Sequence, residues 1–338
     1  MIGGMARAVV ATAYGGPEVL DVIELPPQPL RPGEVLIDVR AAGVNPADWK
    51  QYSGAWGTDP AQLPMRLGHE AAGVIADVAD QPDDDALPVG AEVIAFHAPG
   101  AYADQIVVPR SALLRKPAAM SWEKAAGLMV SGVAAVHTLA ATRVGAGDTV
   151  LVHGASGGVG AMIVQLARAR GARVIGTADP ANHEYLVDLG AVPVGYGPGL
   201  VDRVRAAARG NLTAAIDVSG TREALDASVT LVHDRRRVAT IAGMGYGAQL
   251  GIKVLGNGPG ADPGTEIREA ARATLIRLVE QGKVDVRVGA TYQLTEAARA
   301  HRAGIEGRVQ GKIILVPRDQ GEGRQGQSRS LLHPLRGR

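Results

Sequence analysis

A glycine-rich turn over residues 155–160 carries the clearest chemical signal in this sequence. The stretch TVLVHGASGGVGAMIVQLARARGARVIGT places the turn between a β-branched run and an amphipathic helical pattern, and a second β-branched run follows. Compared with the pattern G-x-G-x-x-G, the three key positions are Ala155, Gly157 and Gly160, so alanine replaces the first glycine. Gly157 would let a pyrophosphate approach the backbone, and Gly160 would let helix and strand pack closely. The amides and the dipole of the helix start attract an anion, so the turn predicts a dinucleotide site.

The end of the second strand indicates which nicotinamide cofactor this turn favours. About 20 residues beyond the glycines an NAD site carries a carboxylate for the ribose 2′-hydroxyl, and this sequence has Thr177 there. Asp179, two residues further on, could still curl back to serve NAD. Asn182, His183 and Tyr196 are polar, non-anionic groups that could surround a 2′-phosphate, so the sequence favours NADPH. His183 taken alone is also compatible with an ordinary exposed helix histidine.

Composition narrows the chemistry that the rest of the chain can perform. The 338 residues include no cysteine, which excludes disulfides, thiolate nucleophiles, zinc ribbons and iron–sulfur clusters and suits a cytoplasmic protein. The 35 basic and 34 acidic residues give a formal charge of +1, which argues against a nucleic-acid-binding protein. The N-terminus lacks a secretory signal pattern, and the uncharged run 125–142 is rich in alanine and glycine and contains Ser131, His137 and Thr138. We therefore expect a buried helix in that run and no membrane segment.

The elements that must position the site change character near residue 120. Up to about Lys116, short β-branched runs such as VLIDV and AGVIADV alternate with glycine and proline turns, which predicts an all-β part such as a barrel. Between Thr149 and Val316, the runs TVLVH, ARVIGT, AAIDV, RVATIA and KIILV alternate with helical patterns. This alternation predicts an α/β fold with a doubly wound parallel sheet. Residues 253–264 read as a turn-rich loop, before a helix and a last strand pair that could rejoin the first domain.

At roughly 100 to 200 residues per domain the chain is long enough for two domains, and we place their boundaries where these patterns change. Residues 1–120, completed by about 262–317, form the first domain, and residues 121–261 form the nucleotide-binding domain. Residues 318–338 contain five arginines against two acidic residues and have little apolar content, which predicts a flexible tail. We interpret this tail as a solvated extension rather than as a nucleic-acid-binding arm.

Two further motifs precede the nucleotide turn, AAGVNPADWKQYSG from Ala41 and LGHEAAGV from Leu67. Together with AAIDVSG, RVATIAG and GKIILVP, they make residues 5–317 resemble the medium-chain dehydrogenase/reductase superfamily, and above all its zinc-independent NADPH quinone oxidoreductases. The resemblance implies a GroES-like β-barrel catalytic domain, an inserted Rossmann domain that binds NADPH, and a cleft between them for the nicotinamide. It also implies a homodimer formed through the Rossmann domains.

The zinc-dependent members of that superfamily hold their catalytic ion with Cys, His and Cys. The matching positions in this sequence are Asn45, His69 and Val130, and the four cysteines of the structural zinc lobe are missing as well. A single imidazole cannot supply the three protein ligands of a catalytic zinc, so we expect no metal. His69 is then either a structural, hydrogen-bonded histidine of the cleft or a catalytic group.

Without a metal to polarise an alcohol, the resemblance implies hydride transfer from NADPH to a quinone or an α,β-unsaturated carbonyl. Asn45 of the Asn-Pro motif would lie beside the nicotinamide and the substrate oxygen, although Asn-Pro also forms turns. The proton would come from water or a nearby acid, and Lys50 and Tyr52 are candidates for that acid unless they are rim residues. Trp56 stands where the family usually has tyrosine, and it would either stack on a flat ring or pack. Ala134 stands where threonine is common.

The resemblance also assigns residues along the cofactor. Ser156, Gly157, Gly158, Val159 and Gly160 would meet the pyrophosphate, Thr177, His183 and Tyr196 the adenosine end, and Ser219, Ile241 and Ala242 the nicotinamide riboside. Two alternative functions stay open at this point: an enoyl thioester reductase and a non-catalytic NADPH-binding interaction protein. Trp56 counts against the first alternative, and the altered residues Lys50, Trp56 and Ala134 leave room for the second.

Overall fold

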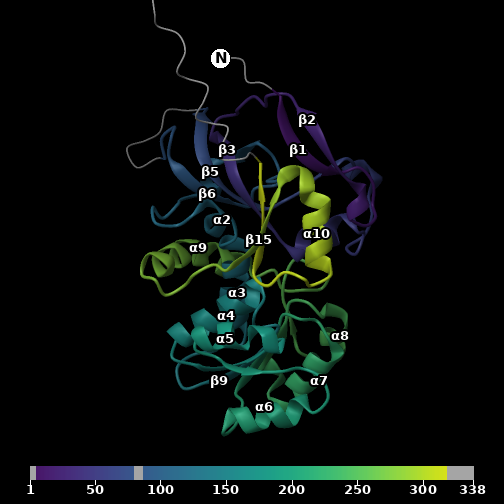
Figure 1. The fold of residues 1–338 in the computed structure, drawn as a ribbon, viewed down its shortest axis with the longest axis vertical. Helices are drawn as coiled ribbons and strands as arrows, with labels where there is room; N and C mark the ends of the chain where they lie inside the picture. The colour runs from purple at the N-terminus through teal and green to yellow at the C-terminus, as the bar shows by residue number, and fades with distance from the viewer. Residues whose placement is uncertain (1–4, 80–86, 318–338) are drawn as a thin grey trace, which may run out of the picture.

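The computed structural model describes residues 5–79 and 87–317, and the tail expected at 318–338 lies outside this part of the chain. Figure 1 shows the early strands β1, β2, β3, β5 and β6 at one end of the molecule and helices α5–α8 at the other. Helices α3 and α9 lie between the two ends. This arrangement agrees with the change of character that the sequence indicates near residue 120.

Two sheets form the end that contains the N-terminal strands. A three-stranded antiparallel sheet has the order β2 (Leu20–Leu25), β1 (Ala6–Ala11) and β4 (Met65–Arg66). A seven-stranded mixed sheet has the order β15-β16-β3-β5-β6-β8, and β7 also pairs with β3. Its strands are β3 (Glu34–Val44), β5 (Glu70–Val78), β6 (Glu92–Phe96), β7 (Gln105–Pro109), β8 (Leu113–Arg115), β15 (Val288–Gln293) and β16 (Lys312–Val316).

Strand β3 illustrates why this part folds as curved β-structure. Val35, Ile37 and Val39 are buried and alternate with more exposed residues, because successive side chains of a strand point to opposite faces. The register of β3 against β5 shifts between Leu36 and Ile37 and again after Val39. Such irregularities bend a strand and increase its twist, which curves the sheet around the buried apolar side chains.

The second part of the chain forms the parallel sheet that the sequence predicts. Its order is β11-β10-β9-β12-β13-β14, the 3-2-1-4-5-6 order of a doubly wound nucleotide-binding fold. The strands are β9 (Thr149–His153), β10 (Arg173–Thr177), β11 (Val192–Val194), β12 (Ala214–Asp217), β13 (Val238–Thr240) and β14 (Lys253–Val254). The expectation that residues 253–264 are entirely loop was wrong in one respect, because Lys253 and Val254 pair with β13 as an edge strand. The α/β fold class is confirmed.

Ten helices occur in the described residues. They are α1 (Pro46–Tyr52), α2 (Trp122–Ala126), α3 (Met129–Ala141), α4 (Gly158–Ala169), α5 (His183–Asp188), α6 (Leu200–Ala208), α7 (Arg222–Leu231), α8 (Met244–Gln249), α9 (Thr265–Glu280) and α10 (Ala297–Ile305). The uncharged run 125–142 thus becomes the end of α2 and the whole of α3, which packs against α4 and α9. Across the described segments, none of these helices is both long and apolar enough to cross a membrane.

The chain returns to the first sheet after α9 and α10. Strand β16 pairs antiparallel with β3, so that Ile314 lies opposite Gly43. This pairing places the last described strand beside the element that leads into α1. The domain boundaries that we expect near residues 120 and 262 stay predictions.

Candidate active site

The turn between β9 and α4 is built around three glycines. Gly154 has a φ of +71°, a left-handed conformation that glycine adopts without strain, and Gly157 is the N-cap of α4. A Cβ on Gly160 would lie 2.2 Å from the Gly154 carbonyl oxygen, so no side chain fits at that position. A Cβ on Gly157 would meet only the same oxygen, at 3.5 Å, which leaves space beside the turn. The sequence analysis missed Gly154, because it assigned the first position of the pattern to Ala155.

The turn before α4 and the first residue of α4 lie against the start of β16 and the segment that leads into it. Ser156 Oγ donates a hydrogen bond to Gln310 Oε1 at 3.0 Å. A Cβ on Gly158 would lie 3.0 Å from Lys312 Cδ, so the aliphatic part of Lys312 passes directly beside the helix start. The residues expected to meet a pyrophosphate therefore lie next to Lys312, which the sequence analysis did not single out.

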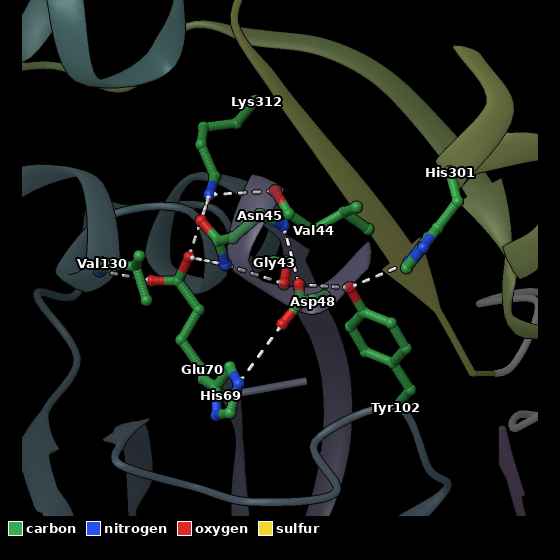
Figure 2. Close-up of polar contacts among 10 residues, drawn as sticks. All are labelled: Gly43, Val44, Asn45, Asp48, His69, Glu70, Tyr102, Val130, His301 and Lys312. Carbon is green, nitrogen blue, oxygen red and sulfur yellow. Dashed lines mark hydrogen bonds and ion pairs between the residues drawn. The ribbon is translucent and has the colours of Figure 1, made fainter. Parts of the chain in front are cut away.

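The ammonium group of Lys312 ends in a buried cluster of barrel residues. Its Nζ donates to Asn45 Oδ1 at 2.5 Å, to Glu70 Oε1 at 2.9 Å and to the Val44 carbonyl oxygen at 3.2 Å (Figure 2). The side chain of Lys312 is 5% exposed and that of Glu70 is fully buried. A buried ion pair of this kind requires its remaining polar atoms to be satisfied as well.

Asn45 and Glu70 satisfy each other and the neighbouring backbone. Asn45 Nδ2 donates to Glu70 Oε1 at 3.1 Å and to the Gly43 carbonyl oxygen at 3.3 Å. Glu70 Oε2 accepts from the Val130 amide at 2.8 Å, which ties β5 to the start of α3. The structure thus brings Asn45 and Val130, two of the positions that match zinc ligands in the family, into one cluster around Glu70. Every side-chain hydrogen of Asn45 is already donated within this cluster.

Asp48 occupies the other side of the cluster and is fully buried. Its Oδ2 accepts from the backbone amide of Asn45 at 2.7 Å and from the Tyr102 hydroxyl at 2.6 Å (Figure 2). Its Oδ1 has no hydrogen-bond partner among the described residues, and His69 Nε2 lies 3.6 Å away. Burial raises the pKa of Asp48, whereas His69, the Tyr102 hydroxyl, the Asn45 amide and Lys312 act to lower it. The sequence analysis did not identify Asp48 or Tyr102.

The two proton donors suggested by the sequence lie in different surroundings. Tyr52 is fully buried, and its hydroxyl lies 3.0 Å from His301 Nδ1, so it communicates with the cluster only through other side chains. Lys50 is half-buried, and burial lowers the pKa of its amine. No described residue hydrogen-bonds the Lys50 ammonium. The catalytic roles assigned to Lys50 and Tyr52 stay predictions.

Trp56 lies where the two parts of the molecule meet. Its side chain is half-buried, and a Cβ on Gly258 would lie 3.5 Å from its Nε1 and 2.4 Å from the sulfur of Met244. Trp56 of the barrel therefore lies close to Gly258 in the loop that follows β14, and Met244 lies beside the same glycine. This contact is compatible with packing and with a wall for a flat substrate.

The expected adenosine end follows strand β10. Thr177 Oγ1 lies 3.1 Å from His153 Nδ1, and both residues are buried. Burial lowers the pKa of His153 to about 4, so this histidine is neutral at pH 7. The Thr177 hydroxyl at the end of β10 is thus held by the neutral ring of His153 on the neighbouring strand β9.

The polar residues beyond Thr177 are more exposed. Asp179 Oδ1 accepts from the Ala181 amide at 2.9 Å, and Asp179 Oδ2 accepts from the Tyr196 hydroxyl at 3.3 Å. Tyr196 is 57% exposed. The His183 ring lies 3.3 Å from the Ala178 carbonyl oxygen. The structure therefore brings Asp179 and Tyr196 into contact, with His183 at the start of α5.

The expected nicotinamide riboside residues follow β12 and β13, at the same edge of the sheet as the turn. Asp217, which is fully buried, organises them by accepting from the Ser219 amide at 3.0 Å and from the Thr240 hydroxyl at 2.7 Å. The Ile241 amide donates to the Asp217 carbonyl oxygen, and the Ala242 amide donates to Thr240 Oγ1. Ligands of doubly wound sheets bind at this carboxyl edge. Asp217 is a further residue that sequence reasoning missed.

The residues at the family's zinc position do not form a zinc site. A catalytic zinc needs three protein ligands, whereas Asn45, His69 and Val130 offer an amide, one imidazole and an aliphatic side chain. The described ranges contain no group of three or more His, Cys, Asp or Glu side chains placed to hold a metal ion. The donor set therefore does not fit the ion.

Comparison with known proteins agrees with this architecture. Residues 31–118 match the family model described as alcohol dehydrogenase GroES-like domain, and residues 158–257 match the model described as zinc-binding dehydrogenase. A quinone oxidoreductase of Salmonella typhimurium is 31% identical over 333 residues, which cover 93% of this chain and all of that protein.

Solved structures extend the similarity to the fold. A mycobacterial protein determined in complex with NADPH is 30% identical and superposes with a TM-score of 0.79, over 93% of this chain and 100% of that one. The quinone oxidoreductase of Coxiella burnetii is 26% identical, with a TM-score of 0.77 and the same coverage of both chains. The expected GroES-like part and Rossmann-type sheet are thereby confirmed. The chain belongs to the quinone oxidoreductase-like medium-chain dehydrogenase/reductase family of oxidoreductases.

Proposed function

We propose that the protein is an NADPH-dependent, zinc-independent reductase that transfers hydride to a quinone or an α,β-unsaturated carbonyl. The observation that carries this proposal is the course of Lys312. Its stem lies beside Gly158 at the start of α4, and its ammonium bonds Asn45 and Glu70 in the barrel. A cofactor whose pyrophosphate rests on α4 would therefore extend its nicotinamide toward the Asn45 cluster.

NADPH would supply the hydride, and the chain's own residues would position the two reactants. The amides at the start of α4 offer positive potential to the pyrophosphate, and the aliphatic stem of Lys312 lies beside them. Asn45 would fix the orientation of Lys312 and Glu70, because its side chain bonds both. Holding a substrate in contact with the nicotinamide supplies much of the acceleration of such a reaction.

Three observations support NADPH rather than NADH. Thr177 stands at the end of β10 in place of the carboxylate that binds a ribose 2′-hydroxyl in NAD sites. Both oxygens of the nearby Asp179 already accept hydrogen bonds, from the Ala181 amide and the Tyr196 hydroxyl. The mycobacterial structural neighbour was determined with NADPH.

Zinc independence is part of the proposal because of the donor set at the family's zinc position. A metal-dependent alcohol dehydrogenase needs the ion as a Lewis acid. A quinone or enone carbon is already electrophilic and accepts hydride without one. The homodimer and the cytoplasmic location expected from the sequence stay predictions, and light scattering tests the first.

A stopped-flow assay tests the proposed function. The loss of NADPH absorbance is followed with a panel of quinones, enones and enoyl thioesters, and each reaction is repeated with NADH and with protein dialysed against a chelator. We expect turnover of quinones or enones with NADPH, unaffected by the chelator. Turnover of enoyl thioesters alone would favour a thioester reductase. Tight NADPH binding without turnover of any compound would favour a non-catalytic interaction protein.

A further inference from the structure

A chain of buried hydrogen bonds leads from the barrel interior to Asp48. The Tyr102 hydroxyl has a single proton, which it donates to Asp48 Oδ2 at 2.6 Å. His301 Nε2, at 3.2 Å, must therefore donate to the Tyr102 oxygen, and His301 Nδ1 must then accept from the Tyr52 hydroxyl at 3.0 Å. All the donors of this chain point toward Asp48, so the chain stabilises the carboxylate and fixes its position.

The neutral state of His301 agrees with this direction. Burial lowers the pKa of His301 to about 4, so its ring carries one proton at neutral pH and can donate through only one nitrogen. Burial also raises the pKa of the Tyr102 hydroxyl, which therefore keeps the proton that it shares with Asp48. Tyr52, His301 and Tyr102 are thus neutral, and Asp48 is the one acidic group that these hydrogen bonds reach.

His69 lies next to Asp48, beyond the end of this row of hydrogen bonds, and is partly exposed. Asp48 Oδ1 has no hydrogen-bond partner in the described part of the protein and points at His69 Nε2, 3.6 Å away (Figure 2). The side chain of His69 is 38% exposed, whereas those of Asp48 and Glu70 are fully buried and that of Lys312 is 5% exposed. Within this cluster His69 is therefore the ionisable group with access to a substrate.

Charged and titratable groups face His69 from several elements without enclosing it. Asp48 from α1 faces it directly, and the Glu70–Lys312 pair behind them carries no net charge. His97, from the turn after β6, interacts with His69 electrostatically but lies 3.7 Å from Glu269, which offsets its own charge. The nearest unbalanced charge is therefore the Asp48 carboxylate.

We propose that His69 is the general acid of this site and that Asp48 is the positioning residue that orients its ring. This inference rests on the proposed hydride transfer. NADPH gives a hydride to the electrophilic carbon and becomes NADP⁺, while the electron pair of the substrate's double bond moves to oxygen. The oxygen anion takes the proton from His69, whose N–H electrons stay on nitrogen, and the neutral ring regains a proton from solvent through its exposed side.

His69→Gln tests the acid role, because glutamine keeps polar atoms but cannot ionise. We expect kcat for an enone to fall by at least about 100-fold, the scale of general acid catalysis, while the NADPH dissociation constant changes by less than about twofold. We also expect kcat/KM of the wild type to fall at high pH, and this decline to disappear in the variant. Free imidazole should restore part of the activity of His69→Ala, which a purely structural role would not allow.

Asp48→Asn tests the positioning role. The variant loses the carboxylate oxygen that faces His69 Nε2, so the ring is no longer held in place. We expect kcat for an enone to fall about tenfold, whereas KM and the NADPH dissociation constant change by less than about twofold. His97→Gln is the matched control, since it removes a neighbouring imidazole outside the chain and should keep the wild-type rate and pH profile. Circular dichroism and NADPH titration establish that each variant is folded.

Three results would overturn the inference. They are a His69→Gln enzyme with the wild-type rate and pH profile, a folded His69→Ala enzyme that imidazole does not rescue, and activity that a chelator abolishes and zinc restores. A wild-type protein that reduces no quinone or enone would remove the proposed function and this inference together. Wild-type turnover with an unaffected His69→Gln would remove the inference alone.

Discussion

Lys312 Nζ lies 2.9 Å from Glu70 Oε1, although the two residues are 242 positions apart in the chain. The pair joins β16 to β5, and Glu70 extends the connection to the start of α3 through the Val130 amide. The stem of Lys312 meanwhile lies against the first turn of α4. One buried ion pair therefore connects the returning strand, the barrel and the cofactor-binding turn.

Removing one member of this pair should destabilise the fold strongly. We expect Glu70→Gln to lower the free energy of unfolding by about 3 kcal/mol, because the Lys312 ammonium stays buried without its counter-charge. Urea denaturation followed by circular dichroism measures the change. The double variant Glu70→Gln with Lys312→Met should recover part of the loss, since it buries no unpaired charge. A single variant as stable as the wild type would contradict a structural role for the pair.

The two glycines at the start of α4 should respond differently to alanine. A Cβ at Gly160 would lie 2.2 Å from the Gly154 carbonyl oxygen, so Gly160→Ala should destabilise the protein and abolish tight NADPH binding. A Cβ at Gly157 would lie 3.5 Å from that oxygen, which is an ordinary contact. The free energy of unfolding of Gly157→Ala should therefore lie within about 0.5 kcal/mol of the wild-type value.

Gly157→Ala should nevertheless weaken the binding of NADPH at least about tenfold, because its methyl group would lie where the pyrophosphate comes close to the backbone. Isothermal titration calorimetry measures the affinity, and thermal denaturation measures the stability of both variants. Unchanged NADPH affinity in Gly157→Ala would show that the pyrophosphate does not approach the backbone at this residue.

Some of the residues in these predictions could be identified from the sequence, and others could not. The turn and its strands follow from local periodicity, and so the sheet, its parallel order and the approximate helix positions could be inferred from the letters. Gly154 was missed because its positive φ has no signature beyond glycine itself. Lys312 is the first residue of a β-branched run and looks like any charged strand end until β16 pairs with β3.

The buried chain from Tyr52 to Asp48 was beyond local inference for a related reason. Tyr52 and His301 are 249 positions apart, and Tyr102 lies 54 positions from Asp48. A histidine in the alanine-rich α10, or a tyrosine at the end of α1 or before β7, carries no sequence signal of its partner. Only the return of α10 to the barrel brings these groups together. Tyr52, one of the two candidate acids in the sequence beside Lys50, therefore lies at the buried end of these hydrogen bonds.

The buried histidines should make stability depend on pH. Burial lowers the pKa of His301 and of His153 to about 4, from an ordinary value of 6.5. Because the folded value lies below the unfolded one, the unfolded chain takes up protons first as the pH falls. Stability is therefore complete above about pH 6.5 and declines toward pH 4, by about 3 kcal/mol for each histidine.

Urea unfolding at several pH values between 7.5 and 4.5 measures this slope. His301→Gln should reduce it whatever its effect on stability at pH 7.5, because one of the histidines that the fold keeps neutral is gone. His233→Gln, which removes an exposed histidine, should leave the slope unchanged. Equal slopes in the wild type and His301→Gln would show that His301 is not kept neutral by the fold.

Asp179 should decide the balance between NADPH and NADH. Its carboxylate lies in the segment after β10, where the adenosine ribose is expected, and it is held by the Ala181 amide and the Tyr196 hydroxyl. If a 2′-phosphate binds there, the carboxylate repels it, so Asp179→Asn should tighten NADPH about fivefold, equivalent to about 1 kcal/mol, and leave NADH nearly unchanged. Fluorescence titration with both cofactors measures the two affinities.

The opposite result identifies the other cofactor. A carboxylate that binds the ribose 2′-hydroxyl of NADH contributes a charge-assisted hydrogen bond. Its replacement by asparagine would then weaken the binding of NADH, and the binding of NADPH would stay weak. Tyr196→Phe separates this effect from local disorder, because it removes the hydroxyl that Asp179 accepts from but leaves the carboxylate charged. Because Tyr196 is itself expected near a 2′-phosphate, Tyr196→Phe should weaken NADPH binding and leave NADH binding nearly unchanged, the opposite of the effect expected for Asp179→Asn.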